Sequence, residues 1–166
     1  ILVNDGSTDQ LTKDILREIG DEKIVKLINQ KNNGLASARN KGVKKSSGSF
    51  IFFLDADDWI EPDALEKMYF YLIGNNKYGY IFPDIFLEGK RNGFIEKEFN
   101  LFEQFFLNQI PYCIFISKQN FIKYGFYDEN MKLGYEDWDL NIKLGVKNIF
   151  GKRLPIPLFH YDVQDT

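Results

Sequence analysis

Residues 49–59 read SFIFFLDADDW, an apolar run that ends abruptly in three aspartates. The apolar residues 50–54 include aromatic and β-branched side chains, and they predict a strand that is buried on both faces. Such strands belong to parallel sheets that are covered by helices, and ligands bind these sheets just beyond the carboxyl ends of the strands. The acidic residues of this stretch therefore fall where a ligand site is expected.

Asp55 and Asp57 point to the same side of the chain, because side chains alternate along an extended backbone. Two neighbouring carboxylates repel each other unless a cation lies between them, and oxygen ligands favour Mg²⁺ or Mn²⁺ over zinc. The alternative is that the acids only cap the next helix, since Pro62 suits a first helical position and Asp58 or Glu61 could serve the helix start. This stretch alone leaves both interpretations open.

The composition predicts one globular domain and excludes several classes of site. The chain has 166 residues, of which 44% are hydrophobic, and no apolar run long enough to span a membrane. Its net charge of −3 argues against a nucleic-acid partner, which would require a basic face. The single cysteine, Cys113, and the single histidine, His160, exclude a disulfide framework and a zinc site built from several such residues. Cys113 is expected to be a buried small hydrophobe.

The first half of the chain alternates between strand and helix, which predicts a parallel α/β sheet with right-handed crossovers. Strands are expected at 1–3, 23–29 and 50–54, and helices at 11–20, 35–45 and 62–74. The second half is less regular. There we expect strands at 78–87, 93–99, 112–117 and 148–161, a hairpin around 88–93, and helices at 101–108, 119–124 and 136–144. Because the first residues already resemble the end of a strand, we expect the chain to be a fragment whose beginning lies upstream.

Asp5 and Arg39 are candidate binding residues. Asp5 follows the first expected strand, where its carboxylate could accept hydrogen bonds from a nucleobase or a ribose; the alternative is that this turn only caps the next helix. Arg39 lies in the segment 33–42, which opens a helix behind the second strand. The N–H groups and cations of that segment would suit an anion, and the alternative is an amphipathic helix with solvated cations.

Two later segments offer candidate catalytic and metal-binding residues. Glu136 and Asp137 stand at an expected helix start, where acids are favoured by the helix dipole. The functional interpretation makes one of them a general base that takes a proton from a hydroxyl nucleophile, with Trp138 offering a flat face to a sugar. His160 is either a packed histidine or a third metal ligand.

Together these segments resemble family 2 glycosyltransferases of the GT-A fold. The resemblance rests on four motifs in order, VNDGSTD at 3–9, NGLASARNKG at 33–42, FLDADD at 53–58 and EDWDL at 136–140, and it covers nearly the whole chain. It implies a GT-A-like, Rossmann-type α/β/α sandwich with a mostly parallel central sheet that lacks the family's first strand and helix. It also implies a single domain, 1–166, with a nucleotide-binding half at 1–74 and an acceptor-side half at 75–166.

The resemblance implies how the donor would be held. Asp5 would bind the base of the nucleotide sugar, most often uracil, with Arg39 near the base or the phosphates. Asp55 would contact the ribose and help to hold Mn²⁺ or Mg²⁺. Asp57 would be the main ligand of that metal ion.

It also implies the reaction. Asp137 would be the catalytic base, supported by Glu136, and His160 would be a further metal ligand. The activity would be inverting, metal-dependent transfer of a hexose-type sugar from a nucleoside-diphosphate sugar, expected to be a UDP-sugar, to a hydroxyl of a glycan or a lipid-linked glycan. Polysaccharide assembly for the cell envelope is the family-level expectation, in the cytoplasm or in peripheral association with the inner membrane face.

Three rival functions remain at this stage. A haloacid-dehalogenase-type phosphatase also has an Asp-x-Asp after a strand, but its motif continues into Gly and Thr or Val, whereas Asp58 and Trp59 follow here. A nucleotidyltransferase of similar architecture would carry a Gly-rich, basic stretch upstream. A non-catalytic nucleotide- or sugar-binding module is the third, and the presence of Asp57 and Asp137 argues against it.

Overall fold

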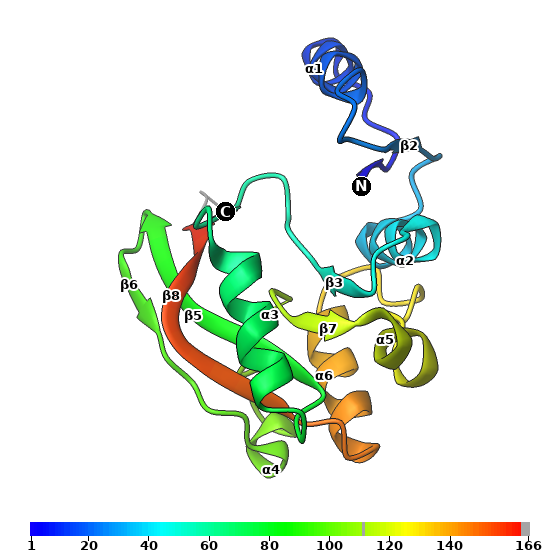
Figure 1. Cartoon of the computed structure of the whole chain (residues 1–166). Helices are drawn as coiled ribbons and strands as arrows, with labels where there is room; N and C mark the ends of the chain where they lie inside the picture. Colours follow the sequence, from blue (N-terminus) through cyan, green and yellow to red (C-terminus); the bar gives the residue numbers. More distant parts are fainter. Residues whose placement is uncertain (111, 164–166) are drawn as a thin grey trace. The chain divides into compact units, whose positions relative to one another are not determined.

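The computed structural model describes residues 1–110 and 112–163, and it contains both helices and strands, so the α/β class is confirmed (Figure 1). The chain forms two compact units. The first unit comprises Ile1–Gly48 and Phe126–Glu136, and the second comprises Ser49–Gly125 and Asp137–Thr166. The division into halves at residue 74 stays a prediction.

The first unit is a parallel strand pair with helices packed on it. Val3 lies opposite Ile28 in this pair, α1 contacts the second strand, and α2 contacts the first. Its elements are β1 (Leu2–Asn4), α1 (Gln10–Gly20), β2 (Leu27–Asn29) and α2 (Leu35–Lys45). The prediction for α2 is confirmed at both ends, whereas β2 is shorter than the expected strand at 23–29.

Local chemistry explains these elements. Asp9 caps α1 by accepting a hydrogen bond from the backbone N–H of Thr12 at 2.8 Å, and this bond lowers the pKa of Asp9 below its usual value. Small residues let α2 approach the strands, since a Cβ added at Gly42 would already lie 3.5 Å from Val3. Asn40 exchanges two hydrogen bonds with the backbone of Tyr127, at 2.9 and 3.0 Å, which attaches the segment Phe126–Glu136 to α2.

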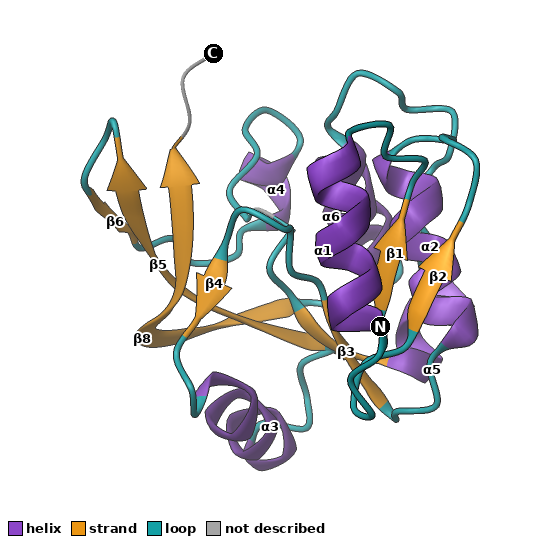
Figure 2. Ribbon diagram, turned by 90° about the horizontal axis from the view of Figure 1, so that it is seen from above, coloured by secondary structure: helices purple, strands orange, loops and turns teal. Residues whose placement is uncertain are grey.

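The second unit is built on a sheet whose described strands run in the order β3-β7-β5-β8-β4, with β6 paired to β5 (Figure 2). The strands are β3 (Phe50–Phe52), β4 (Trp59–Ile60), β5 (Tyr80–Gly89), β6 (Gly93–Ile95), β7 (Phe115–Ser117) and β8 (Gly151–Val163). The helices are α3 (Ala64–Gly74), α4 (Leu101–Gln104), α5 (Lys118–Tyr124) and α6 (Glu136–Val146), the last of which begins at the final residue of the first unit.

The expectation of a mostly parallel central sheet is wrong for this sheet. Among its described strands only β5 and β8 pair in parallel, whereas the pairs β3–β7, β4–β8, β5–β6 and β5–β7 are antiparallel. Parallel pairing requires crossover connections, and the regular strand–helix alternation that supplies them is confined to the first part of the chain. Later strands return by shorter connections, such as the predicted hairpin between β5 and β6, which is confirmed.

The long pairing of β5 with β8 includes a change of register. The register shifts between Pro83 and Asp84 and again between Asp84 and Ile85, opposite the part of β8 that contains Pro155 and Pro157. Prolines have no N–H to donate to a ladder, so the two strands adjust locally rather than ending there. β8 curves strongly along its length (Figure 1).

One core cluster of the second unit lies between α3 and the sheet, and its buried members are Ala64, Met68, Leu72, Ile81, Phe115, Leu154 and Leu158. Cys113 is buried, as predicted. The residues of β3 are only half-buried, which corrects the expectation of a strand covered on both faces. The reason is that β3 stands at the end of the described strand order and has only β7 beside it there.

Candidate functional site

The predicted site residues divide between the two units. Asp5, Arg39 and Glu136 belong to the first unit. The other four, Asp55, Asp57, Asp137 and His160, belong to the second unit.

Asp5 fastens two loops together. Its Oδ1 atom accepts hydrogen bonds from the side-chain amide of Gln30 at 2.7 Å and from the backbone N–H of Asn33 at 2.8 Å. Its Oδ2 atom accepts one from the N–H of Gly34 at 2.8 Å. Asp5 follows β1, as predicted, and its partners follow β2, so the carboxylate lies at the carboxyl ends of both strands. A carboxylate has about four acceptor positions, so these bonds leave capacity for a ligand donor.

Arg39 and Glu136 form a buried ion pair. Nη1 of Arg39 lies 2.7 Å from Oε1 of Glu136, and each side chain is only 7% exposed. The ring of Tyr127 faces the guanidinium, with 5.3 Å between the ring centroid and Cζ. The sequence marked both residues but did not predict that they pair, because they lie 97 positions apart. The pair therefore joins α2 to the last residue of the segment Phe126–Glu136 within the first unit.

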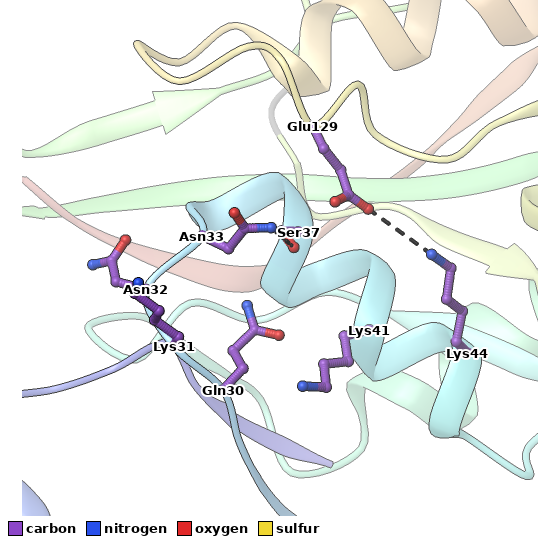
Figure 3. Close-up of a pocket in the computed structure, with 8 residues that line it drawn as sticks. All are labelled: Gln30, Lys31, Asn32, Asn33, Ser37, Lys41, Lys44 and Glu129. Atoms are coloured by element: carbon purple, nitrogen blue, oxygen red, sulfur yellow. Dashed lines mark hydrogen bonds and ion pairs between the residues drawn. The ribbon is translucent and has the colours of Figure 1, made fainter.

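A polar cavity of about 420 Å³ lies beside α2 in the first unit (Figure 3). It is lined by Gln30, Lys31, Asn32, Asn33, Ser37, Lys41, Lys44 and Glu129. Nζ of Lys44 lies 3.9 Å from Glu129. The hydrogen bond from Asn40 lowers the pKa of Glu129 below its usual value, and the charges of Lys44 and Lys132 lower it further. The lysines and amides would suit an anion, and the anion-binding interpretation of this segment stays a prediction.

In the second unit, Asp58 anchors the acidic turn. The hydroxyl of Tyr112 donates to one of its carboxylate oxygens, and the N–H of Asp162 donates to the other at 2.9 Å. The same tyrosine oxygen accepts a hydrogen bond from the N–H of Asp55 at 3.2 Å. Burial raises the pKa of Asp58, against the effect of these donors. Asp58 therefore shapes the turn that presents Asp55, which is half-buried, and Asp57, which is exposed.

Tyr161, on β8, is a further group of the second unit that the acidic residues influence. Burial raises the pKa of its phenol, and the negative charges of Asp58, Asp57, Asp55 and Asp137 raise it further. The charges of the acidic turn and of Asp137 therefore both act on this phenol. Sequence reasoning did not select Tyr161, and its position beside His160 was the only available signal.

The oxygen donors of Asp55 and Asp57 fit a hard divalent cation. Within residues 1–110 and 112–163, no three acidic, histidine or cysteine side chains are arranged as a complete metal cage. Mg²⁺ is commonly held by one or two carboxylates together with phosphates of the substrate, so a pair of aspartates at a ligand site matches this requirement. Metal binding by Asp55 and Asp57 stays a prediction.

His160 is packed between carboxylates and an indole. Its ring stacks on Trp59 with 3.4 Å between centroids and 10° between the planes. Nδ1 lies 3.0 Å from Glu88 and Nε2 lies 3.0 Å from Glu61. A metal ion at His160 would have to replace one of these carboxylate contacts. Its role as a metal ligand stays a prediction.

Asp137 lies in the first turn of α6. Its Oδ1 accepts a hydrogen bond from the N–H of Trp138 at 2.7 Å, and its Oδ2 accepts one from the side-chain amide of Asn108 at 3.2 Å. Nothing in the sequence pattern singled out Asn108. A carboxylate held in this way can orient and deprotonate a hydroxyl group.

Comparison with known proteins gives the family. The sequence model described as Glycosyl transferase family 2 matches residues 1–136, and the chain therefore belongs to this family. Over 71 residues, or 42% of this chain, it is 45% identical to the glycosyltransferase GlyA of Streptococcus pneumoniae serotype 4. Over 65 residues, or 39% of this chain, it is 42% identical to a chondroitin synthase of Pasteurella multocida.

The fold is also that of solved structures of S. aureus TarS. The crystal structure of S. aureus TarS 1-349 in complex with UDP-GlcNAc superposes with a TM-score of 0.75 over 99% of this chain at 17% identity. The GT-A-like fold is thereby confirmed. The chain spans about half of that TarS chain, and its matched stretches cover 10% of GlyA and 7% of the chondroitin synthase.

Proposed function

We propose that this chain is the catalytic part of an inverting glycosyltransferase that uses a UDP-sugar. The observation that carries the proposal is that Asp55 and Asp57 follow β3 in one turn while Asp137 is held separately in the first turn of α6, because this combines a pair suited to a metal ion with a separate candidate base. The neighbours support the donor class, since TarS was crystallised in complex with UDP and with UDP-GlcNAc. The name of the chondroitin synthase supports a polysaccharide product.

The donor would be held from its base to its diphosphate. Asp5 would accept the N–H of the base, and Arg39 would serve the base or the phosphates. Asp55 would contact the ribose, and with Asp57 it would hold Mn²⁺ or Mg²⁺; His160 is a further candidate ligand. The bound cation would act as a Lewis acid that offsets the negative charge on the departing nucleoside diphosphate.

Asp137 would take the proton from the acceptor hydroxyl as that oxygen attacks the anomeric carbon. The new carbon–oxygen bond forms on the face opposite the diphosphate, while the bond to the diphosphate breaks and UDP leaves with its electron pair. The transition state is expected to resemble an oxocarbenium ion, as in glycoside hydrolysis. A single displacement inverts the anomeric configuration. Glu136 would support this geometry through its pairing with Arg39.

The acceptor would be a glycan or a lipid-linked glycan, and the protein would associate peripherally with the inner membrane face. The supporting observation is an apolar surface on and after α4, where the side chains of Phe102, Phe105, Phe106 and Leu107 are 50–72% exposed. Exposed apolar clusters of this kind mark membrane or protein contacts. None of the helices in the described part of the chain is long and apolar enough to cross a bilayer.

A screen of nucleotide sugars with the full-length protein tests the activity. We expect metal-dependent release of UDP, faster in the presence of an acceptor glycan, and an inverted anomeric configuration in the product. Hydrolysis of phosphomonoesters without sugar transfer would instead identify a phosphatase. Binding of UDP with no turnover against any acceptor would favour a binding module.

The base is tested by Asp137→Asn. This change keeps the shape of the side chain but removes the basic carboxylate, so we expect donor binding to persist while transfer falls by roughly 10²–10⁴-fold. Asp139→Asn is the matched control, because Asp139 lies two positions along α6 and pairs with Lys143 at 2.8 Å. Transfer by Asp137→Asn at the rate of the control would place the base elsewhere.

A further inference from the structure

The segment that follows α4 is joined to the first turns of α6 by amide side chains. The Nδ2 atom of Asn108 donates to Oδ2 of Asp137 at 3.2 Å. The Oδ1 atom of Asn108 in turn accepts a hydrogen bond from Nε2 of Gln104 at 3.4 Å. Gln104 is completely buried, so this side chain gives Asn108 a fixed support.

The backbone that carries Asn108 is held at several further points. The indole N–H of Trp138 donates to the carbonyl oxygen of Gln104. The side-chain amide of Asn141, which is 1% exposed, donates to the carbonyl of Ile110 at 2.8 Å. Within the segment, the N–H of Gln109 donates to the side-chain carbonyl of Gln104 at 3.3 Å. Contacts on both sides of residue 108 therefore limit the movement of its side chain.

An asparagine amide has a definite chemical effect on a carboxylate. Its nitrogen can donate a hydrogen bond but cannot take a proton, so it stabilises the ionised carboxylate and does not compete as a base. Hydrogen bonds to a charged acceptor are also shorter and stronger than neutral ones. With Trp138 N–H on Oδ1 and Asn108 on Oδ2, each oxygen of Asp137 has a fixed donor and the plane of the carboxylate is set.

We propose that Asn108 is a positioning residue for sugar transfer, which fixes the orientation of the Asp137 carboxylate and keeps it ionised for the acceptor hydroxyl. This inference rests on the proposed function, in which Asp137 is the base. Other ionisable side chains bear on this region, among them Asp55, Asp57 and Asp58, whose charges act on the same phenol as that of Asp137. Tyr161 on β8 senses the charge of Asp137, and Asp139 on α6 is paired with Lys143.

The test is the pH dependence of transfer by the full-length protein with Asn108→Ala. Loss of the donor should lower kcat roughly ten-fold and leave the affinity for UDP within about two-fold, because the amide acts through the base. It should also move the acidic limb of the kcat profile upward by roughly one pH unit, because one hydrogen bond to the ionised base is lost. Asn108→Asp, which keeps the size and adds a like charge, should move the limb further in the same direction.

Asn141→Ala is the matched structural control, because it removes a tether of the same segment without contacting Asp137. It should lower stability and leave the acidic limb at the wild-type pH. An acidic limb that stays in place in both Asn108 variants would overturn the inference. If Asp137 is not the base, Asp137→Asn will retain transfer whatever the Asn108 variants do. The failure of the proposed function can therefore be told apart from the failure of this inference.

Discussion

Replacing Glu136 by leucine should destabilise the first unit by about 3–5 kcal/mol, because the guanidinium of Arg39 stays buried while its carboxylate partner is lost. The magnitude follows from the structure, in which the charged atoms lie 2.7 Å apart and each side chain is 7% exposed. Typical domains unfold with a free energy of about 5–15 kcal/mol, so this change would remove a large share of the total. Arg39→Met should cost a similar amount by leaving Glu136 unpaired.

The double variant Arg39→Met with Glu136→Leu distinguishes the attraction between the two charges from the free-energy cost of burying them. Replacing both charges by apolar groups of similar volume is often close to neutral, so the double variant should recover most of the loss seen in either single variant. Urea unfolding, monitored by hydrogen exchange of the α2 amides, measures the loss of stability in the first unit, which contains the pair. Single variants that each lose less than about 1 kcal/mol, or a double variant that loses their sum, would refute the buried-pair argument.

The same double variant tests the predicted contact of Arg39 with the donor. If Arg39 also binds the base or the phosphates, the folded double variant will bind UDP more weakly than the wild type. Unchanged UDP affinity would show that the residue acts only through Glu136.

Three further changes test the arrangement around the site. Tyr112→Phe removes a donor to Asp58 and should cost about 1–2 kcal/mol by urea unfolding; an unchanged midpoint would show that the hydroxyl does not anchor the acidic turn. Asp5→Asn places an amide donor against backbone N–H groups, so the amides of Asn33 and Gly34 should exchange hydrogen faster. Wild-type protection of both amides would show that Asp5 does not hold the two loops together. Glu129 has a lowered pKa in the folded protein, so it contributes stability above its usual pKa of 4.5 that is lost as the pH falls through the lowered value. Glu129→Gln should therefore unfold with a smaller loss of stability between pH 5 and pH 3 than the wild type, and identical slopes would disprove this assignment.

Signals that act over a few residues predicted much of the fold. The helix at 35–45 was expected from its flanking glycine and small residues, and α2 has those bounds. Gly34 has a φ of +91°, a conformation that glycine adopts at little cost, and this lets the chain turn into the helix. The hairpin around 88–93 was also predictable, because two apolar runs flank a glycine-containing turn, and Leu87 lies opposite Gly93 in the structure.

Contacts between distant positions could not be predicted in the same way. The partners of Asp58 lie 54 and 104 positions away, and no local pattern connects Tyr112 or Asp162 with the acidic turn. The short strand β4 escaped notice because its two residues form a strand only through pairing with β8. The candidate site residues were identifiable as acids at strand and helix ends, but their orientation depends on these distant partners.

The most direct test of the proposed function is calorimetry of UDP binding to the full-length protein, with Mn²⁺ or with EDTA, in the wild type and in Asp57→Ala. Asp63→Ala is the control, because this nearby acid pairs with Lys67 at 2.7 Å on the surface of the second unit. We expect binding that requires Mn²⁺ in the wild type and in the control, and that is lost in Asp57→Ala. Equal UDP affinity with EDTA present, or in Asp57→Ala, would contradict the assignment of the acidic turn as a metal-dependent donor site.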